Sequence, residues 1–204
     1  MSHKCFISFK KEDAIYKDEI VKKLRREDVI VKSLDRWIDS EDEGYIMSQI
    51  RKDYLGDSTV TIFIIGKHSS ELEGVDKLKR DKNYFIKREL QASLYDGEPP
   101  NTRNGILGVV LPDVQGKIFK GSYVCSECGN EHRYVHVGDD VLIREFSQNY
   151  YIRPHDGCCW TEGDRYCVLV RYEDFIENPD KYINKAYDKR ALSVASKVTI
   201  RPAR

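Results

Sequence analysis

The run from Thr59 to Gly66, which reads TVTIFIIG, constrains the fold more than any other part of the chain. It is rich in β-branched residues and almost wholly apolar, and it ends at a glycine. A short apolar run of this kind is typical of a parallel strand that is covered by helices on both faces. The run therefore predicts the central strand of a parallel sheet.

Other strands and helices alternate around this run. Apolar stretches that predict further strands lie at 3–9, 29–31, 106–111 and 166–170. Segments with a helical spacing of apolar residues lie at 13–27, 46–56, 83–94 and 179–187, the last with Pro179 in its first turn. This alternation predicts an α/β domain with a flavodoxin-like, mainly parallel five-stranded sheet and right-handed crossovers.

One region interrupts the alternation. Residues 113–165 are rich in Gly, Tyr, Cys and His without sustained periodicity, and they are too many for an ordinary connection. We interpret them as an insertion before the last strand. The predicted organisation is then a core at 1–112, the insertion, a completing strand and helix at 166–192, and a basic tail at 193–204 that only packing would order.

Charge and hydropathy exclude some classes of function. Lysine plus arginine total 34, as do aspartate plus glutamate, so the net charge is zero and a general nucleic-acid binder is disfavoured. The zero net charge does not exclude a local basic pocket. No apolar run approaches the roughly 18 residues of a membrane span, and no secretory leader is recognised. We expect a soluble cytoplasmic protein without a membrane partner.

A helical carboxylate, Glu89, suggests chemistry. In the predicted helix Ile86, Leu90 and Leu94 form the apolar face, and Glu89 borders it. The residues three and four positions away are Phe85, Ile86, Ala92 and Ser93, none of which is a cation. Glu89 is either a functional residue or a glutamate that is solvated or reaches a partner on another element.

The topology predicts where a ligand would bind. Doubly wound sheets bind ligands beyond the carboxyl ends of their strands, which for a flavodoxin-like order means between the first and third strands. Ser8, Phe9 and Lys10 leave the first of these strands. The third is followed by Gly66, Lys67, His68, Ser69 and Ser70. These residues and Glu89 are expected to converge.

Three stretches carry a family resemblance. They are 5–9 (CFISF), 58–66 (STVTIFIIG) and 85–90 (FIKREL). Their order and spacing resemble the Toll/interleukin receptor (TIR) superfamily, and within it the TIR-like proteins of the bacterial Thoeris anti-phage defence system. Phe85 stands where the family commonly has tryptophan. The resemblance covers roughly the first half of the chain, and the insertion carries none of these motifs.

The resemblance implies cleavage of NAD+ at the nicotinamide-ribose bond, with Glu89 as the essential residue and no cofactor or catalytic metal. A carboxylate suits this reaction because it stabilises an oxocarbenium-like ribose. Phe85 or Phe9 would stack on a ring of the substrate, and Lys10 would neutralise the diphosphate. Ser8 or Ser69 would donate hydrogen bonds. In the competing interpretation both phenylalanines are core residues and Lys10 is solvated.

The resemblance also implies regulation and a role. Trp37 and Asp39 lie in the loop that corresponds to the family's mobile loop, where they would close over substrate or contact another subunit. Alternatively Trp37 packs on its own loop. Active sites of TIR enzymes are commonly completed by a neighbour, so activity should rise on self-association. The product, either ADP-ribose, a cyclic isomer or a conjugate, would be a messenger for a separate effector protein.

The insertion holds four of the six cysteines. Cys125 and Cys128 have the C-x-x-C spacing of a zinc knuckle, which Cys159, Cys158 or His155 could complete. The adjacent residues Cys158 and Cys159 seldom offer both sulfur atoms to one metal ion. The alternative is that the cysteines of the insertion are reduced and only pack against their neighbours. Cys5 and Cys167 lie in predicted strands and are expected in the core.

Three other classes of function share features with this sequence. A non-catalytic TIR-type interaction module would use Glu89 structurally and the acidic loop at 39–43 for assembly. A nucleoside deoxyribosyltransferase would also use a glutamate but act on nucleosides. A phosphoacceptor receiver domain needs an aspartate at the end of the third strand, where this chain has Ile65 and Gly66, and is discounted.

Overall fold

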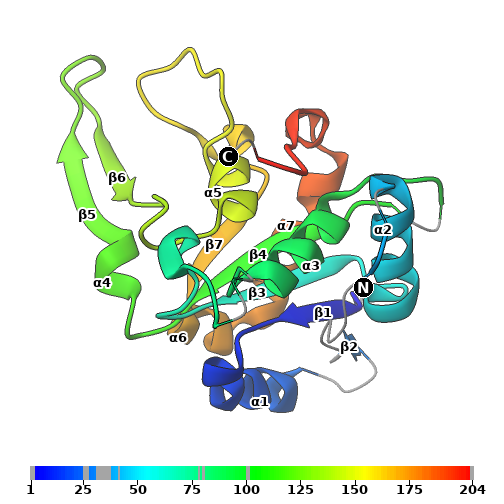
Figure 1. Ribbon diagram of the computed structural model, residues 1–204. Coiled ribbons are helices and arrows are strands. Elements are labelled where there is room, and N and C mark those ends of the chain that lie inside the picture. The colour runs from blue at the N-terminus through cyan, green and yellow to red at the C-terminus, as the bar shows by residue number, and fades with distance from the viewer. Residues whose placement is uncertain are drawn as a thin grey trace.

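The computed structural model describes residues 3–24, 28–30, 38–40, 42–77, 79, 81–99 and 102–202. Its centre is a five-stranded sheet in the order β2-β1-β3-β4-β7, and every neighbouring pair is parallel (Figure 1). The strands are β1 (Cys5–Ser8), β2 (Val29–Ile30), β3 (Val60–Ile65), β4 (Gly105–Val110) and β7 (Val168–Arg171). The α/β class, the flavodoxin-like order and the central place of the TVTIFIIG strand are confirmed. Trp37 lies outside the described residues.

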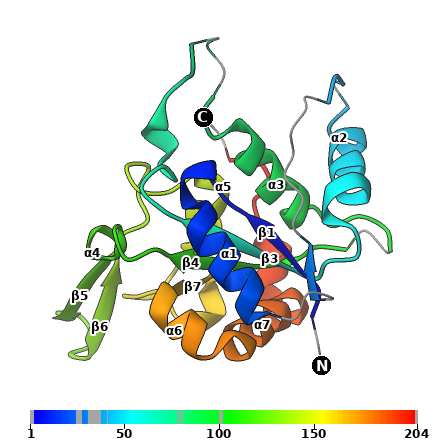
Figure 2. The ribbon, with the colours of Figure 1, turned by 90° about the horizontal axis from the view of Figure 1, so that it is seen from below.

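Helices cover both faces of the sheet. They are α1 (Ala14–Lys23), α2 (Glu43–Ile50), α3 (Tyr84–Leu94), α4 (Gln115–Ile118), α5 (Arg144–Tyr150), α6 (Tyr172–Glu177) and α7 (Pro179–Asp188). Figure 2 shows α1, α6 and α7 together on one side of the strands. A π-helical turn, Arg51–Leu55, continues α2. Helix α1 is shorter than predicted, since it ends at Lys23.

Alternate side chains of the central strands divide the core into two faces. Ile62 and Ile64 of β3 pack in a cluster with residues of α1, α6 and α7. Phe63 and Ile65 pack on the opposite face with α3 and α5. All six residues of β3 are buried, as expected for a strand between two helical layers. Burial on both faces explains why its sequence lacks polar alternation.

The insertion contributes to this core. Between β4 and β7 the chain forms α4, an antiparallel hairpin of β5 (Phe119–Val124) and β6 (Glu131–Val135), and α5. Phe146 of α5 is fully buried, and its ring centroid lies 5.9 Å from that of Phe63. Gly108 permits this approach, because a Cβ atom there would lie 2.6 Å from the Phe146 ring. Part of the insertion is therefore integral to the main domain.

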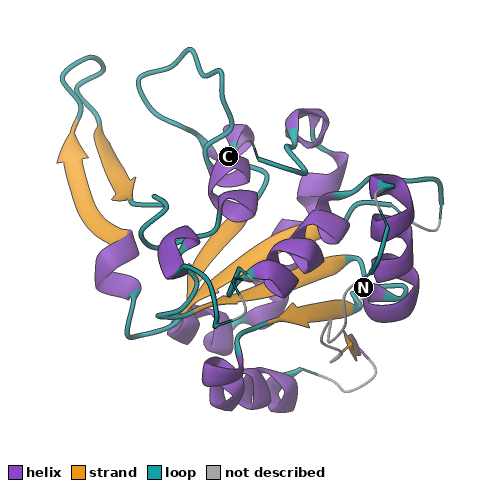
Figure 3. Cartoon of the chain, in the orientation of Figure 1, coloured by secondary structure: helices purple, strands orange, loops and turns teal. Residues whose placement is uncertain are grey.

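The hairpin itself extends away from the sheet (Figure 3). The sequence pattern missed it, because most side chains of β5 and β6 are exposed and show no apolar alternation. We call residues 119–135 the arm.

Residues 193–202 pack against the insertion side of the core. Val194 is buried in the cluster that contains Phe146. The Asn149 side chain donates to the carbonyl oxygen of Thr199 and accepts from its N–H, at 2.8 and 2.9 Å. These contacts hold the predicted basic tail against the domain. Among the described residues, none of the helices combines the length and apolar character that crossing a bilayer demands.

Candidate functional site

The carboxyl end of β1 brings Ser8 against α3. Ser8 is the last residue of the strand and is fully buried. Its hydroxyl donates a hydrogen bond of 2.7 Å to Oε2 of Glu89, which is only 3% exposed. The two residues are 81 positions apart in the chain. The fold thus unites two of the residues singled out in the sequence.

A chain of buried hydroxyl groups fixes the helix that carries Glu89. The Ser93 hydroxyl donates to the Glu89 carbonyl oxygen at 2.8 Å, and it also lies 2.7 Å from the Thr61 hydroxyl of β3. Because the single proton of Ser93 is used, Thr61 is the donor to Ser93. Thr61 in turn accepts from the Asn104 amide at 3.0 Å. Buried polar groups that are all satisfied lock α3 in one register over β3.

Lys10 ties the end of β1 to the start of the same helix. Its ammonium group donates to the Lys82 carbonyl oxygen at 2.8 Å and to the Asn83 side chain at 2.9 Å. Burial lowers the pKa of Lys10 below its usual value. Lys10 is therefore held by the protein rather than simply solvated.

A hollow of about 640 Å³ lies beside this edge of the sheet. Two of the predicted site residues, Lys10 and Phe85, line it. The remaining lining residues are mostly charged: Lys11, Glu12, His68, Glu73, Asp76, Asp81 and Lys82. Ser8 and Glu89 are not among them, and both are buried.

The other predicted binding residues lie apart from the hollow. Phe9 is half-buried among the residues of the α1 face, with the Lys17 ammonium group 5.5 Å from its ring centroid. Ser69 is buried, and its oxygen accepts from the N–H of Gly66 at 3.0 Å, which shapes the turn after β3. Asp39 is exposed. The core interpretation thus fits Phe9 best.

Asp13 is a second buried carboxyl group at this edge, and the sequence pattern gave it no role beyond starting a helix. It is 6% exposed, and its Oδ2 atom accepts no hydrogen bond from the described residues. A Cβ atom on Gly66, just after β3, would lie 2.5 Å from its Oδ1. Burial raises the pKa of Asp13 to about 6. The sequence does not distinguish Asp13 as a buried group, because an aspartate is common in the first turn of a helix that follows a strand.

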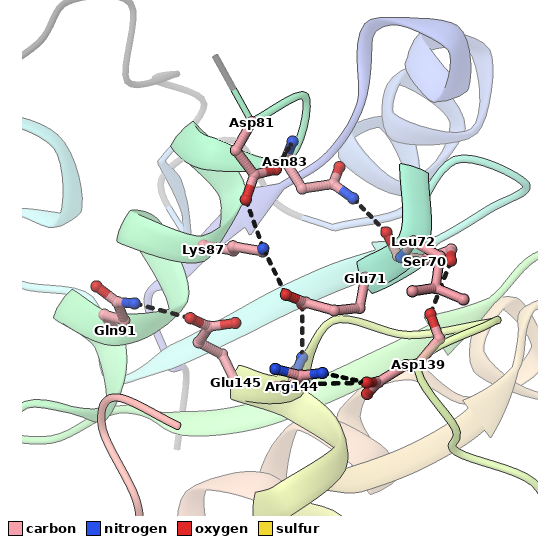
Figure 4. Close-up of polar contacts among 10 residues, drawn as sticks. All are labelled: Ser70, Glu71, Leu72, Asp81, Asn83, Lys87, Gln91, Asp139, Arg144 and Glu145. Atoms are coloured by element: carbon pink, nitrogen blue, oxygen red, sulfur yellow. Dashed lines mark hydrogen bonds and ion pairs between the residues drawn. The ribbon is translucent and has the colours of Figure 1, made fainter. Parts of the chain in front are cut away.

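A seam of polar contacts holds α3 against the loop after β3 and against α5 (Figure 4). Lys87 of α3 bridges Glu71 at 2.8 Å and Asp81 at 2.5 Å. The other oxygen of Glu71 accepts from the N–H of Arg144, and Gln91 donates to Glu145 at 2.7 Å. Burial also raises the pKa of Glu145. The insertion therefore braces the helix that carries Glu89.

A second candidate site lies where the arm meets the loop before β7. Cys125, Cys128, His132 and Cys158 place their ligand atoms within 4.8 Å of one another. Cys128 Sγ lies 3.0 Å from His132 Nε2, and Cys158 Sγ lies 3.9 Å from the same nitrogen. Three sulfur atoms and one imidazole nitrogen at such spacing could bind a metal ion.

The predicted knuckle pair belongs to this cluster, and so does Cys158. Cys159 and His155, which the sequence also suggested, are not in it. His132 was missed, although its position four residues after Cys128 was the available signal. Cys128 is exposed, so packing does not explain it, whereas Cys5 and Cys167 are buried in the core as predicted.

No protein-family model matches this sequence, and no curated protein matches it either. The TIR resemblance therefore rests on the three short motifs, and the function has to be argued from the site.

Proposed function

We propose that the protein cleaves the bond between nicotinamide and ribose in NAD+, with Glu89 as the catalytic carboxylate. The observation that carries this proposal is the Ser8 to Glu89 hydrogen bond of 2.7 Å, buried at the carboxyl end of β1, two residues before Lys10, which lines the hollow. Ligands of doubly wound sheets bind at this edge. The resemblance to TIR motifs implies an essential glutamate at the same residue.

The reaction needs a negative charge in a dry environment. When the bond from ribose C1′ to the ring nitrogen breaks, both electrons leave with nicotinamide, which becomes neutral, and C1′ becomes cationic. A buried carboxylate stabilises that cation more strongly than one in water. The hydrogen bond from Ser8 fixes the orientation of the Glu89 carboxylate, which limits reorganisation during the reaction.

Residues that line the hollow supply binding. Phe85 offers a ring on which nicotinamide or adenine stacks, and Lys10 offers a cation for the diphosphate. Lys10 would exchange its bonds to Lys82 and Asn83 for phosphate oxygens. Since Glu89 is 3% exposed, substrate reaches it only when the hollow opens. We connect this opening with self-association, so that the isolated chain has low activity.

Capture of the C1′ cation decides the product. Water, losing a proton, yields ADP-ribose, an atom of the same molecule yields a cyclic isomer, and another nucleophile yields a conjugate. By resemblance to Thoeris proteins, we propose that the product is a cytoplasmic messenger in antiviral defence. It would activate a separate effector protein.

A non-catalytic interaction module is the second candidate. The near-complete burial of Glu89, which does not line the hollow, favours it, because a structural glutamate needs no access to a ligand. A nucleoside deoxyribosyltransferase is a third, and it differs from the others by releasing base from nucleosides.

Replacing Glu89 by glutamine separates these candidates. The amide still accepts the hydrogen bond from Ser8 but carries no charge, so nicotinamide release from NAD+ should fall by at least about a hundredfold. Release is measured by chromatography over a range of protein concentrations, and wild-type specific activity should rise with concentration. Glu145→Gln, at another buried glutamate that accepts a hydrogen bond but does not line the hollow, is the matched control and should keep activity.

Unchanged turnover in folded Glu89→Gln protein would contradict the catalytic role. A wild type that releases no nicotinamide, together with a large fall in melting temperature for Glu89→Gln, would establish the structural role instead. Release of base from deoxynucleosides, with NAD+ left intact, would establish the transferase.

We also propose that Cys125 and Cys128 hold a structural zinc ion. Thiolate ligands select zinc among the common divalent cations, and the C-x-x-C spacing presents two of them from one turn.

A further inference from the structure

We infer that Cys125, Cys128, His132 and Cys158 form a complete Cys3His zinc centre that clamps the loop before β7 onto the arm. This inference rests on the zinc proposed at Cys125 and Cys128, and it adds the two ligands that close the site. Cys125 directly follows β5 and Cys128 lies in the hairpin turn, while His132 is on β6. Cys158 comes from the loop between α5 and β7, 26 positions after His132.

The distances suit a tetrahedral ion. Zn–S bonds of about 2.3 Å and Zn–N bonds of about 2.0 Å place tetrahedral ligand atoms roughly 3.5 to 3.8 Å apart. In the structure Cys128 Sγ and Cys158 Sγ lie 3.0 and 3.9 Å from His132 Nε2, and no pair in the cluster exceeds 4.8 Å. Small shifts of side chains would bring all four to ideal spacing.

The backbone of the turn is shaped for two thiolates. The N–H of Cys125 donates to the Asn130 carbonyl oxygen at 2.9 Å, and the N–H of Gly129 donates to the Cys125 carbonyl oxygen at 2.9 Å. Gly129 has a φ of +70°, which glycine adopts without steric cost. This tight turn directs Cys125 and Cys128 toward the same point.

The arm lacks the apolar burial that stabilises the rest of the molecule. Tyr123, Val124 and Tyr134 are 48%, 72% and 50% exposed. An isolated two-stranded hairpin is marginally stable in water. Figure 1 shows the hairpin tip and the loop before β7 projecting on the same side of the sheet. A metal ion bound to both segments would supply the stability that burial does not.

His155 and Cys159, the two other candidate ligands, lie outside the cluster. The His155 ring stacks on Trp160 with centroids 4.4 Å apart, and its Nδ1 lies 3.9 Å from an Asp164 oxygen. Cys159 adjoins Cys158 but lies outside the cluster. They provide matched controls, one histidine and one cysteine from the same loop.

Metal content of the purified full chain tests this inference. The wild type should hold about one zinc per chain by mass spectrometry of the metal. Cys158→Ser and His132→Asn should each lower zinc retention at least about tenfold against a competing chelator. Cys159→Ser and His155→Asn should match the wild type. Cobalt substituted into the wild type should show the visible absorption of a tetrahedral thiolate site.

The outcomes separate the two proposals. Zinc that is lost with Cys128→Ser but kept with Cys158→Ser and His132→Asn would overturn the ligand set and leave the knuckle proposal intact. Wild-type protein that binds neither zinc nor cobalt would overturn both. If a ligand variant fails to fold, the cobalt spectrum of the wild type and of Cys159→Ser still decides the result.

Discussion

The central strand β3 and the arm strand β5 have the same length but opposite surroundings. All six residues of β3 are buried, whereas five of the six in β5 are exposed. Burial of apolar side chains holds the first in place, at about 25 cal/mol for each Å² removed from water. The exposed side chains of β5 remain in water, so burial does not stabilise this strand. A buried core therefore stabilises the sheet, and we propose that a metal ion held by the Cys/His cluster stabilises the arm.

The polar groups of the two regions differ in the same way. Near the sheet, Ser8, Glu89, Thr61 and Ser93 are buried and joined by hydrogen bonds of 2.7 to 2.8 Å. In the cluster at the arm, Cys128 is exposed and Cys158 is partly exposed, although Cys125 is buried. The polar groups at the sheet edge are therefore held by the fold itself, whereas we propose that a metal ion taken from solution holds the arm.

The largest effect should come from a cavity in the core. Phe63→Ala removes a fully buried ring from β3 and should lower the free energy of unfolding by about 3 to 5 kcal/mol. Tyr123→Ala in the arm, at a side chain 48% exposed, should change it by less than about 0.5 kcal/mol. Urea denaturation measures both. Equal losses would contradict the division into two regions.

A smaller effect should come from Asp13 and depend on pH. Its pKa is raised from 3.8 to about 6 by burial, so the folded state binds the proton more tightly than the unfolded state. Stability from this group is therefore greatest below pH 4, falls between about pH 4 and 6, and stays low above pH 6. Asp13→Asn should raise the free energy of unfolding at pH 7 by up to about 3 kcal/mol.

Denaturation at several pH values checks the sign of this effect. The control is Asp57→Asn, at an exposed carboxylate whose pKa a hydrogen bond from Lys4 lowers. That group contributes its stability above its unfolded pKa, so its removal should have a small effect of opposite sign. An Asp13→Asn variant that is less stable than the wild type at pH 7 would contradict the raised pKa of Asp13.

Metal removal should change the free energy of unfolding of the whole domain less than either Phe63→Ala or Asp13→Asn. A chelator should speed amide hydrogen exchange in the arm and in the loop before β7, because these segments would lose the proposed zinc cross-link. Amides of β3 and β4 should keep their protection, since their hydrogen bonds lie inside the core. Exchange followed by mass spectrometry on peptides from each region checks this. Loss of protection throughout the sheet would show that the metal supports the whole domain.

Much of the sheet could be predicted because its signals are local. The apolar run at β3 and the spacing of Ile86 and Leu90 in α3 follow from side-chain periodicity alone. The meeting of Ser8 with Glu89 followed from strand order, because topology determines which strand ends are neighbours. The arm could not be predicted, since exposed strands carry no apolar alternation.

The α/β class, the buried central strand, the helix of Glu89 and the C-x-x-C pair could all be predicted, because each depends on residues close together in the chain. The anchoring of Lys10 to the start of α3, the burial of Asp13, and the joining of His132 and Cys158 to the thiol cluster are visible only in the folded protein. These are contacts between segments distant in sequence, and their geometry depends on how the elements pack. No local pattern of side chains specifies that packing.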